Sequence, residues 1–232
     1  MNVGFAALEM NADLGISSAT FGFGSGIFFL GYCLFETPSN IILERGGARL
    51  WIARIMVTWG LISVGLMLVR TPPLFYLPRF PLGVAEAGFF PGVIYYLSLW
   101  YPAAHRARAI AAFMTAVPVT GLIGGPLSEA LLELDGIYGL KGWQWLFLVE
   151  GLPAVVLGSS VMFYLTDRPE TARWLGPAER DLLVEKLAAE RKACALRPNI
   201  RVALTDTTIW SSESFFFWSQ LDFMATPSGH RS

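Results

Sequence analysis

The sequence predicts an all-α membrane protein that crosses the bilayer several times. Hydrophobic residues make up 54% of the 232 positions and charged residues only 15%, against roughly 25% charge in soluble domains. Most charge lies in short connectors and in the segment after residue 166, so long apolar blocks remain between them. Each block approaches or exceeds the roughly 20 residues that a helix needs to cross the hydrocarbon. A soluble core does not need such blocks.

Five complete spans are predicted. Residues 1–8 form an apolar fragment that is too short to cross a bilayer, and we interpret it as the end of a preceding helix. The spans and their connectors then occupy residues 9–166. The individual apolar blocks cover residues 20–43, 50–69, 74–101, 109–132 and 143–166.

The connectors predict the orientation of these spans. Arginines gather in the loops 44–49 and 102–108 and in the segment after residue 166, whereas the alternate connectors carry few. Basic residues are retained on the cytoplasmic side of a membrane. The sequence therefore places the two arginine-rich loops and the segment after residue 166 in the cytoplasm.

The segment after the last span is expected to differ in character. Residues 167–203 read as a cytoplasmic connector, and the leucine spacing after Pro177 predicts an amphipathic surface helix. A further apolar patch at 209–223 is interrupted by charge and is too short to span. We expect residues 204–232 to be a truncated or aberrant tail.

Several classes of protein are not supported by the composition. The net charge of -1 provides no basic field for nucleic acid. Cys33 and Cys194 are far apart and lie in no disulfide or zinc motif, and no signal peptide is recognisable. A nucleotide-binding glycine loop, a metal-ligand cluster and a nucleophile beside a histidine are all missing from the sequence. The expectation is a protein that is not an enzyme and needs no cofactor or metal.

Charged residues inside the spans are the candidates for function, because each costs about 2.5–3.5 kcal/mol at a helix centre. Arg79 and Glu86 belong to the same span and are two turns apart, so they share one face about 10 Å apart along the axis. A permanently charged arginine suits an anionic substrate, and a buried glutamate can exchange protons. The alternative is that the two residues satisfy each other or polar neighbours.

Other features of the spans favour structural roles. Arg54 and Glu36 lie near the cytoplasmic ends, where snorkelling or ion pairing explains them. Glu150 has no partner that the sequence identifies. Small residues spaced four apart allow helices to approach closely in lipid. Such pairs are Gly22 with Gly26, Gly88 with Gly92, and Gly121 with Gly125.

The loop after the first complete span carries a family resemblance. It reads ERGGAR at 44–49 and resembles the D-R-x-G-x-R gating loop between helices two and three of the major facilitator superfamily. Its matching residues are Glu44, Arg45, Gly47 and Arg49. The resemblance implies that the spans are helices two to six of an N-terminal six-helix half, with residues 1–8 as the remnant of helix one.

Longer motifs narrow the resemblance. The stretches ETPSNIILERGGARLWIAR, RFPLGVAEAGFFPGVIYYL, WQWLFLVEGLPA and LTDRPETARWL are similar to the anion:cation symporter family of bacterial organic-acid permeases. That family takes up tartrate, glucarate, galactonate or phthalate. The resemblance implies proton-coupled uptake of a small organic anion by alternating access across the bacterial inner membrane. It assigns substrate binding to Arg79 and proton coupling to Glu86.

The resemblance also shows departures. In that family an Asp-Arg pair on helix one directly precedes the stretch that corresponds to residues 2–6 here. Six further helices follow the central connector in that family. The intact protein is therefore expected to need a missing C-terminal half as its partner. The alternatives are a half-length membrane fragment, a scaffold or pseudogene product that transports nothing, and a homodimer of half-units.

Overall fold

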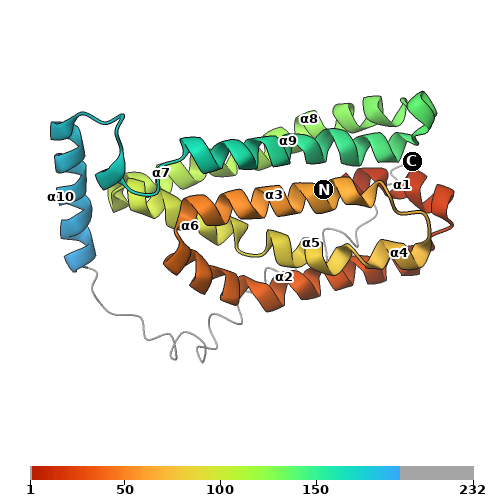
Figure 1. Ribbon diagram of the computed structural model, residues 1–232, viewed down its shortest axis with the longest axis horizontal. Helices are drawn as coiled ribbons and strands as arrows, with labels where there is room; N and C mark the ends of the chain where they lie inside the picture. Colours follow the sequence, from red (N-terminus) through yellow and green to blue (C-terminus); the bar gives the residue numbers. More distant parts are fainter. Residues whose placement is uncertain (1, 194–232) are drawn as a thin grey trace, which may run out of the picture. The chain divides into compact units, whose positions relative to one another are not determined.

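The computed structural model describes residues 2–193, and nearly all of them lie in helices (Figure 1). Short connectors join consecutive helices, so neighbours in the sequence run back and forth beside one another. The α-helices are α1 (Asn2–Leu14), α2 (Ser18–Gly46), α3 (Ala48–Leu66), α4 (Pro72–Tyr76), α5 (Arg79–Glu86), α6 (Phe89–Trp100), α7 (Ala103–Met114), α8 (Ala116–Leu132), α9 (Gly142–Tyr164) and α10 (Pro177–Ala193).

Five helical segments of the described chain are long and apolar enough to cross a membrane, as predicted. They are α2, α3, the combined α4–α6, the combined α7–α8, and α9. The preceding helix α1 continues to Leu14, six residues past the predicted end of the apolar remnant. The predicted connector 167–203 is described as far as residue 193, and the predicted tail 204–232 lies outside the described residues.

The span formed by α4–α6 is broken into three helices. Counting α1 as the first, we call it the fourth span, α7–α8 the fifth and α9 the sixth. Leu77 and Pro78 separate α4 from α5, and Ala87 and Gly88 separate α5 from α6. Gly88 has a φ of 82°, in the left-handed region that glycine adopts without the steric cost of a side chain. Because unwound backbone in a membrane needs other hydrogen-bonding partners, the contacts of the second break are important for the site.

Helices α3 and α9 pack closely through glycines that face the other helix. A side chain at Gly60 would meet the backbone of Gly151, and one at Gly151 would meet Val64 and the Gly60 carbonyl. Further along the pair, Gly158 lies against Met56. A similar approach joins α2 to α5, where Gly83 lies against the backbone of Phe28.

The predicted glycine pairs are mostly not the sites of close helix approach. A side chain added at Gly22, Gly26, Gly121 or Gly125 would meet no atom within 4 Å in the described structure. Gly92 would make only ordinary contacts, and only Gly88 is tightly enclosed, by Ser39. Within the described residues the prediction was wrong for the pairs Gly22 with Gly26 and Gly121 with Gly125, because spacing along one helix does not determine which face meets a neighbour.

The end of the bundle away from the arginine-rich loops is held by an aromatic core and by polar ties. Trp143 of α9 is almost fully buried in a cluster that includes Phe75, Phe147 and Met10. Its indole N–H donates to Asp13 at 3.2 Å, and the Lys141 ammonium lies 3.5 Å from the same carboxylate. These contacts fasten α1 to the start of α9.

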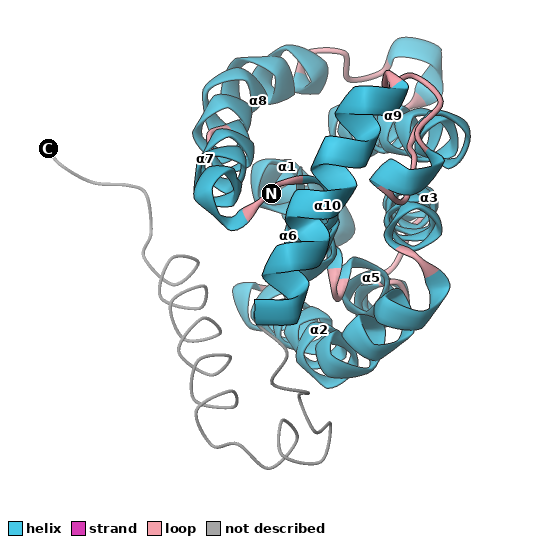
Figure 2. Ribbon diagram, turned by 90° about the vertical axis from the view of Figure 1, so that its left-hand side faces the viewer, coloured by secondary structure: helices cyan, strands magenta, loops and turns pink. Residues whose placement is uncertain are grey.

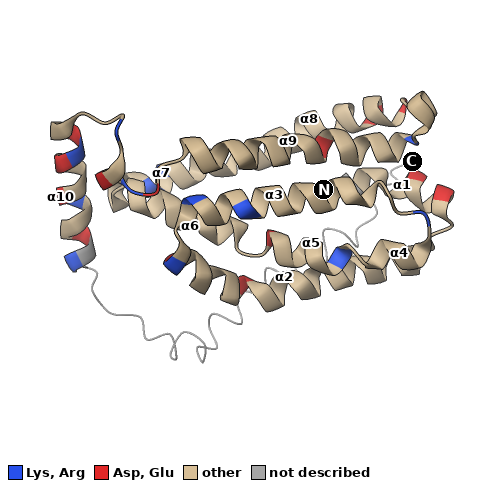
Figure 3. Cartoon of the chain, viewed as in Figure 1, with Lys and Arg blue, Asp and Glu red and all other residues tan. Residues whose placement is uncertain are grey.

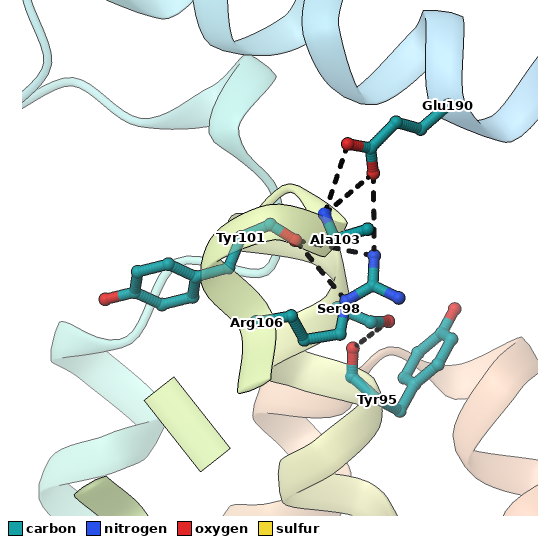
Figure 4. A network of polar contacts seen from close by, with 6 residues as sticks. All are labelled: Tyr95, Ser98, Tyr101, Ala103, Arg106 and Glu190. Atoms are coloured by element: carbon teal, nitrogen blue, oxygen red, sulfur yellow. Dashed lines mark hydrogen bonds and ion pairs between the residues drawn. The ribbon is translucent and has the colours of Figure 1, made fainter. Parts of the chain in front are cut away.

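Helix α10 confirms the surface helix predicted after Pro177, and it runs across the ends of the spans rather than along them (Figures 1 and 2). Its Glu190 carboxylate accepts the backbone N–H of Ala103, at 2.9 and 3.1 Å from its two oxygens. The same carboxylate lies 3.9 Å from the Arg106 guanidinium (Figure 4). Since the first N–H groups of a helix have no partner within it, Glu190 caps α7.

Candidate functional site

Charged side chains are concentrated at the helix ends and on α10, and few occur along the middle of the spans (Figure 3). The fourth span contains two of these few, at the two ends of the eight-residue helix α5. Arg79 is its first residue and Glu86 its last, so the helical rise separates them by about 10 Å along the axis. The break after α5 follows Glu86 directly.

The Arg79 side chain is enclosed by aromatic rings. The residue is only 5% exposed, and its guanidinium carbon lies 4.8 Å from the ring centre of Phe75 and 5.9 Å from that of Phe21. The ring faces attract a cation. Its Nε atom is buried and has no hydrogen-bond partner among the described residues. The site thus holds a cation on a desolvated aromatic surface, with a donor still available.

Glu86 lies midway between Pro72 and Trp100, the limits of the fourth span. It is partly buried, and the helix α5 that ends with it packs against α2 and α3. The structure therefore places this residue at the centre of the span, in a helix that packs against α3.

A chain of hydrogen bonds holds the break that follows Glu86. The Ser39 hydroxyl of α2 donates to the Ala87 carbonyl at 2.7 Å, and the Trp51 indole of α3 donates to the Ser39 oxygen at 2.9 Å. The guanidinium of Arg54 covers the Trp51 ring at 4.1 Å. Sequence reasoning missed Ser39 and Trp51, because a serine and a tryptophan within a span are ordinary residues until a broken helix lies beside them.

Two of the three remaining charges noted within the spans, Arg54 and Glu150, have contacts of different kinds. Arg54 is partly buried over Trp51. Glu150 of α9 accepts a long hydrogen bond, 3.4 Å, from the fully buried Ser128 of α8. This contact is a partner that the sequence did not identify for Glu150.

The loop 44–49 connects α2 to α3 and is tied to the end of α9. Gly47 has a φ of 87° and separates the two helices. The Arg49 backbone N–H donates to Asp167 at 2.8 Å, and the Arg49 Nε lies 3.5 Å from the same carboxylate. Glu44 and Arg45 are exposed and line an open pocket of about 210 Å³ together with Asp167. Asp167 was missed as a partner, although it follows directly after the last predicted span.

In the part of the chain that the structure describes, no group of three histidine, cysteine or acidic residues is placed to hold a metal ion.

Comparison with known proteins identifies the family. Residues 1–228 match the family model of the Major Facilitator Superfamily. A protein of Agrobacterium vitis with the provisional name tartrate transporter is 58% identical over 193 residues, which are 83% of this chain and 45% of that protein. The inner membrane transport protein RhmT of Escherichia coli K12 is 39% identical over 209 residues, 90% of this chain and 48% of that protein. The chain thus spans about half the length of these curated relatives.

A solved structure supports the same fold. The crystal structure of a bacterial homologue of the human lysosomal transporter Spinster, inward-facing and occupied, superimposes with a TM-score of 0.66 at 22% sequence identity. The match covers 72% of this chain and 41% of the other. At that identity the likeness concerns the fold alone. With the family model, the relatives and the five apolar spans in agreement, this multi-pass membrane chain belongs to the major facilitator superfamily.

Proposed function

We propose that this chain forms one half of a bacterial inner-membrane transporter that takes up a small organic anion together with a proton. The observation that carries the proposal is the placement of Arg79 and Glu86 at the two ends of α5, inside the broken fourth span. The provisional name of the Agrobacterium vitis relative, tartrate transporter, supports an organic acid as substrate. The name of the Escherichia coli relative supports the inner membrane.

Arg79 is proposed to bind the anion. Its Nε is a buried donor without a partner among the described residues, and a guanidinium presents paired N–H groups that match a carboxylate. Because Arg79 is enclosed by Phe21 and Phe75, the anion reaches it only when the surrounding side chains part. A site that opens by movement of packed helices is consistent with alternating access around a site near the membrane midplane.

Glu86 is proposed to carry the proton. A carboxyl at the centre of a span is costly when charged. Protonation of Glu86 and binding of the anion at Arg79 are therefore expected to be linked. The loop residues Glu44, Arg45, Gly47 and Arg49 are proposed to gate the cytoplasmic end. Their tie to Asp167 would restrain α3 and α9 together during the cycle.

The experiment is uptake by a chimera in proteoliposomes. The matched segment of the Agrobacterium vitis relative is replaced by the corresponding residues of this chain, and uptake of labelled tartrate is driven by a pH gradient. Arg79→Ala is expected to abolish binding and uptake. Glu86→Gln is expected to abolish accumulation against a gradient and to retain exchange of tartrate across the membrane.

Matched controls are two exposed residues of the connectors, Arg70→Ala and Glu133→Gln, which should transport as the parent chimera does. Normal accumulation with both Arg79→Ala and Glu86→Gln would end the assignment. The chain by itself, reconstituted in parallel, tests the alternative of a non-transporting half. Uptake by the chain alone would favour a homodimer of half-units.

A further inference from the structure

Ser39 connects two helices to the break in the fourth span. It is 5% exposed, donates to the Ala87 carbonyl at 2.7 Å and accepts from the Trp51 indole at 2.9 Å. A hydroxyl has one donor and two acceptor lone pairs, so both bonds form at once. The result is a buried polar chain that runs from α3 through α2 to the peptide that ends α5.

The Ala87 carbonyl needs this donor because a proline lies four residues after it. In a continuous helix it would accept the N–H of the residue four positions later, which is Pro91 and has no N–H. An unsatisfied carbonyl is costly within the hydrocarbon, where water is not available. Ser39 therefore supplies a hydrogen bond that the span cannot make by itself.

The geometry at Gly88 shows how closely the break is fitted to Ser39. Gly88 has a φ of 82°, and a side chain added there would run into the Ser39 side chain. The Trp51 ring that donates to Ser39 is in turn covered by the Arg54 guanidinium at 4.1 Å. Trp51 thus orients the Ser39 hydroxyl, and that hydroxyl in turn holds the Ala87 carbonyl at the break.

We propose that Ser39, oriented by Trp51, is a positioning residue for Glu86. Glu86 directly precedes Ala87, so fixing the Ala87 carbonyl fixes the last turn of α5 and with it the direction in which the Glu86 carboxyl projects. The importance of that direction rests on the proposed role of Glu86 in proton coupling. The positioning itself is measurable without transport.

The test is the rate at which dicyclohexylcarbodiimide, an apolar reagent for carboxyl groups, labels Glu86. The purified full chain in lipid nanodiscs is labelled, and modification of Glu86 and Glu150 is quantified by mass spectrometry. In Ser39→Ala the Ala87 carbonyl loses its donor and the end of α5 loosens. We expect labelling of Glu86 to rise about three- to tenfold, the factor by which loss of one buried hydrogen bond changes an opening equilibrium.

The conservative and matched variants make the result specific. Ser39→Thr retains the hydroxyl and should label as the parent does, while Trp51→Phe removes the donor to Ser39 and should raise labelling of Glu86. Ser25→Ala is the matched control, because Ser25 also lies on α2 but donates at 3.1 Å to Phe21 of its own helix. Its labelling should equal that of the parent.

Glu150 serves as the internal reference, since it lies on α9 and bonds to Ser128 instead. Equal labelling of Glu86 in the parent and Ser39→Ala, or no labelling of Glu86 in any variant, would overturn the proposal. So would a parallel rise at Glu86 and Glu150, which indicates general loosening. If Ser39→Ala is not recovered folded, Trp51→Phe decides by the same criteria.

The failure of this proposal is distinguishable from failure of the proposed function. Normal proton-driven accumulation by the Glu86→Gln chimera would remove the coupling role and leave the labelling result unchanged. Unchanged labelling in the Ser39 and Trp51 variants would remove the positioning role and leave the transport result unchanged.

Discussion

The α3–α9 pair and the fifth span, α7 with α8, are both apolar enough to cross a membrane, yet they pack in opposite ways. In the pair, Gly60, Gly151 and Gly158 bring helices together until side chains and backbone touch. In the fifth span, the most apolar stretch of 18 residues contains no buried residue within the described structure. A side chain added at Gly121 or Gly125 would meet no atom within 4 Å. Glycine therefore allows close helix packing in the α3–α9 pair, whereas at Gly121 and Gly125 of the fifth span it lies on a face that no described helix covers.

The difference shows what holds helices together in this molecule. Lipid is as apolar as the side chains, so hydrophobicity does not drive one span against another, and close packing and polar bonds decide instead. The α3–α9 pair has facing glycines and the additional tie between Arg49 and Asp167. In the part of the chain that the structure describes, the fifth span is tied to α9 by the hydrogen bond from Ser128 to Glu150.

The largest effect is expected from filling the α3–α9 contact. Gly151→Val places a branched side chain against Val64 and the Gly60 carbonyl, and overpacking of this kind costs about 2–3 kcal/mol. The measurement is the free energy of unfolding in detergent, followed by circular dichroism during titration with dodecyl sulfate.

Gly121→Val in α8 is the matched control, because a side chain there meets nothing within 4 Å. It should change the free energy of unfolding by less than about 0.5 kcal/mol. Equal destabilisation by the two valines would break the contrast between the two regions.

An intermediate effect is expected at the polar tie of the pair. Asp167→Ala removes the acceptor of the Arg49 N–H and the ion pair with its side chain, at a cost of about 1.5 kcal/mol for a partly exposed charged acceptor. Asp167→Asn retains an amide oxygen as acceptor and should cost about 0.5 kcal/mol, the small value of a partly exposed ion pair. The same unfolding titration measures both.

The control is Asp181→Ala on α10, whose highly exposed carboxylate lies 3.8 Å from the guanidinium of the neighbouring Arg180. Its removal should leave stability unchanged. If Asp167→Ala were equally silent, the loop 44–49 would not be fastened to α9 in the way the distances indicate.

The smallest effect is expected at the bond between the fifth and sixth spans. Ser128→Ala removes a 3.4 Å hydrogen bond to Glu150, and polar bonds between helices in membranes average about 0.6 kcal/mol. A double-mutant cycle with Glu150→Gln isolates the pairwise energy.

Ser159→Ala provides the comparison for this bond, because its hydroxyl donates to Val155 of its own helix and its loss should not change contacts between helices. A coupling energy between Ser128 and Glu150 as large as the effect of Gly151→Val would show that the fifth span is held more firmly than its packing indicates.

The candidate site was predictable only in part. Arg79 and Glu86 were found from the sequence because a charge within an apolar block is visible without any structure. Their surroundings were not found. The aromatic enclosure of Arg79 depends on Phe21 from α2, and the break beside Glu86 depends on Ser39 and Trp51 from two other helices.

The sequence by itself determined the five spans, the connectors between them and the surface helix α10, because length, hydropathy and charge are properties of single segments. Only the tertiary structure decided which glycines meet a neighbour, how the fourth span is broken beside Glu86, and that Asp167 holds the loop 44–49. These features are properties of pairs of surfaces. A bilayer treats all apolar faces nearly alike, so the pattern along one helix does not indicate which face another helix will contact.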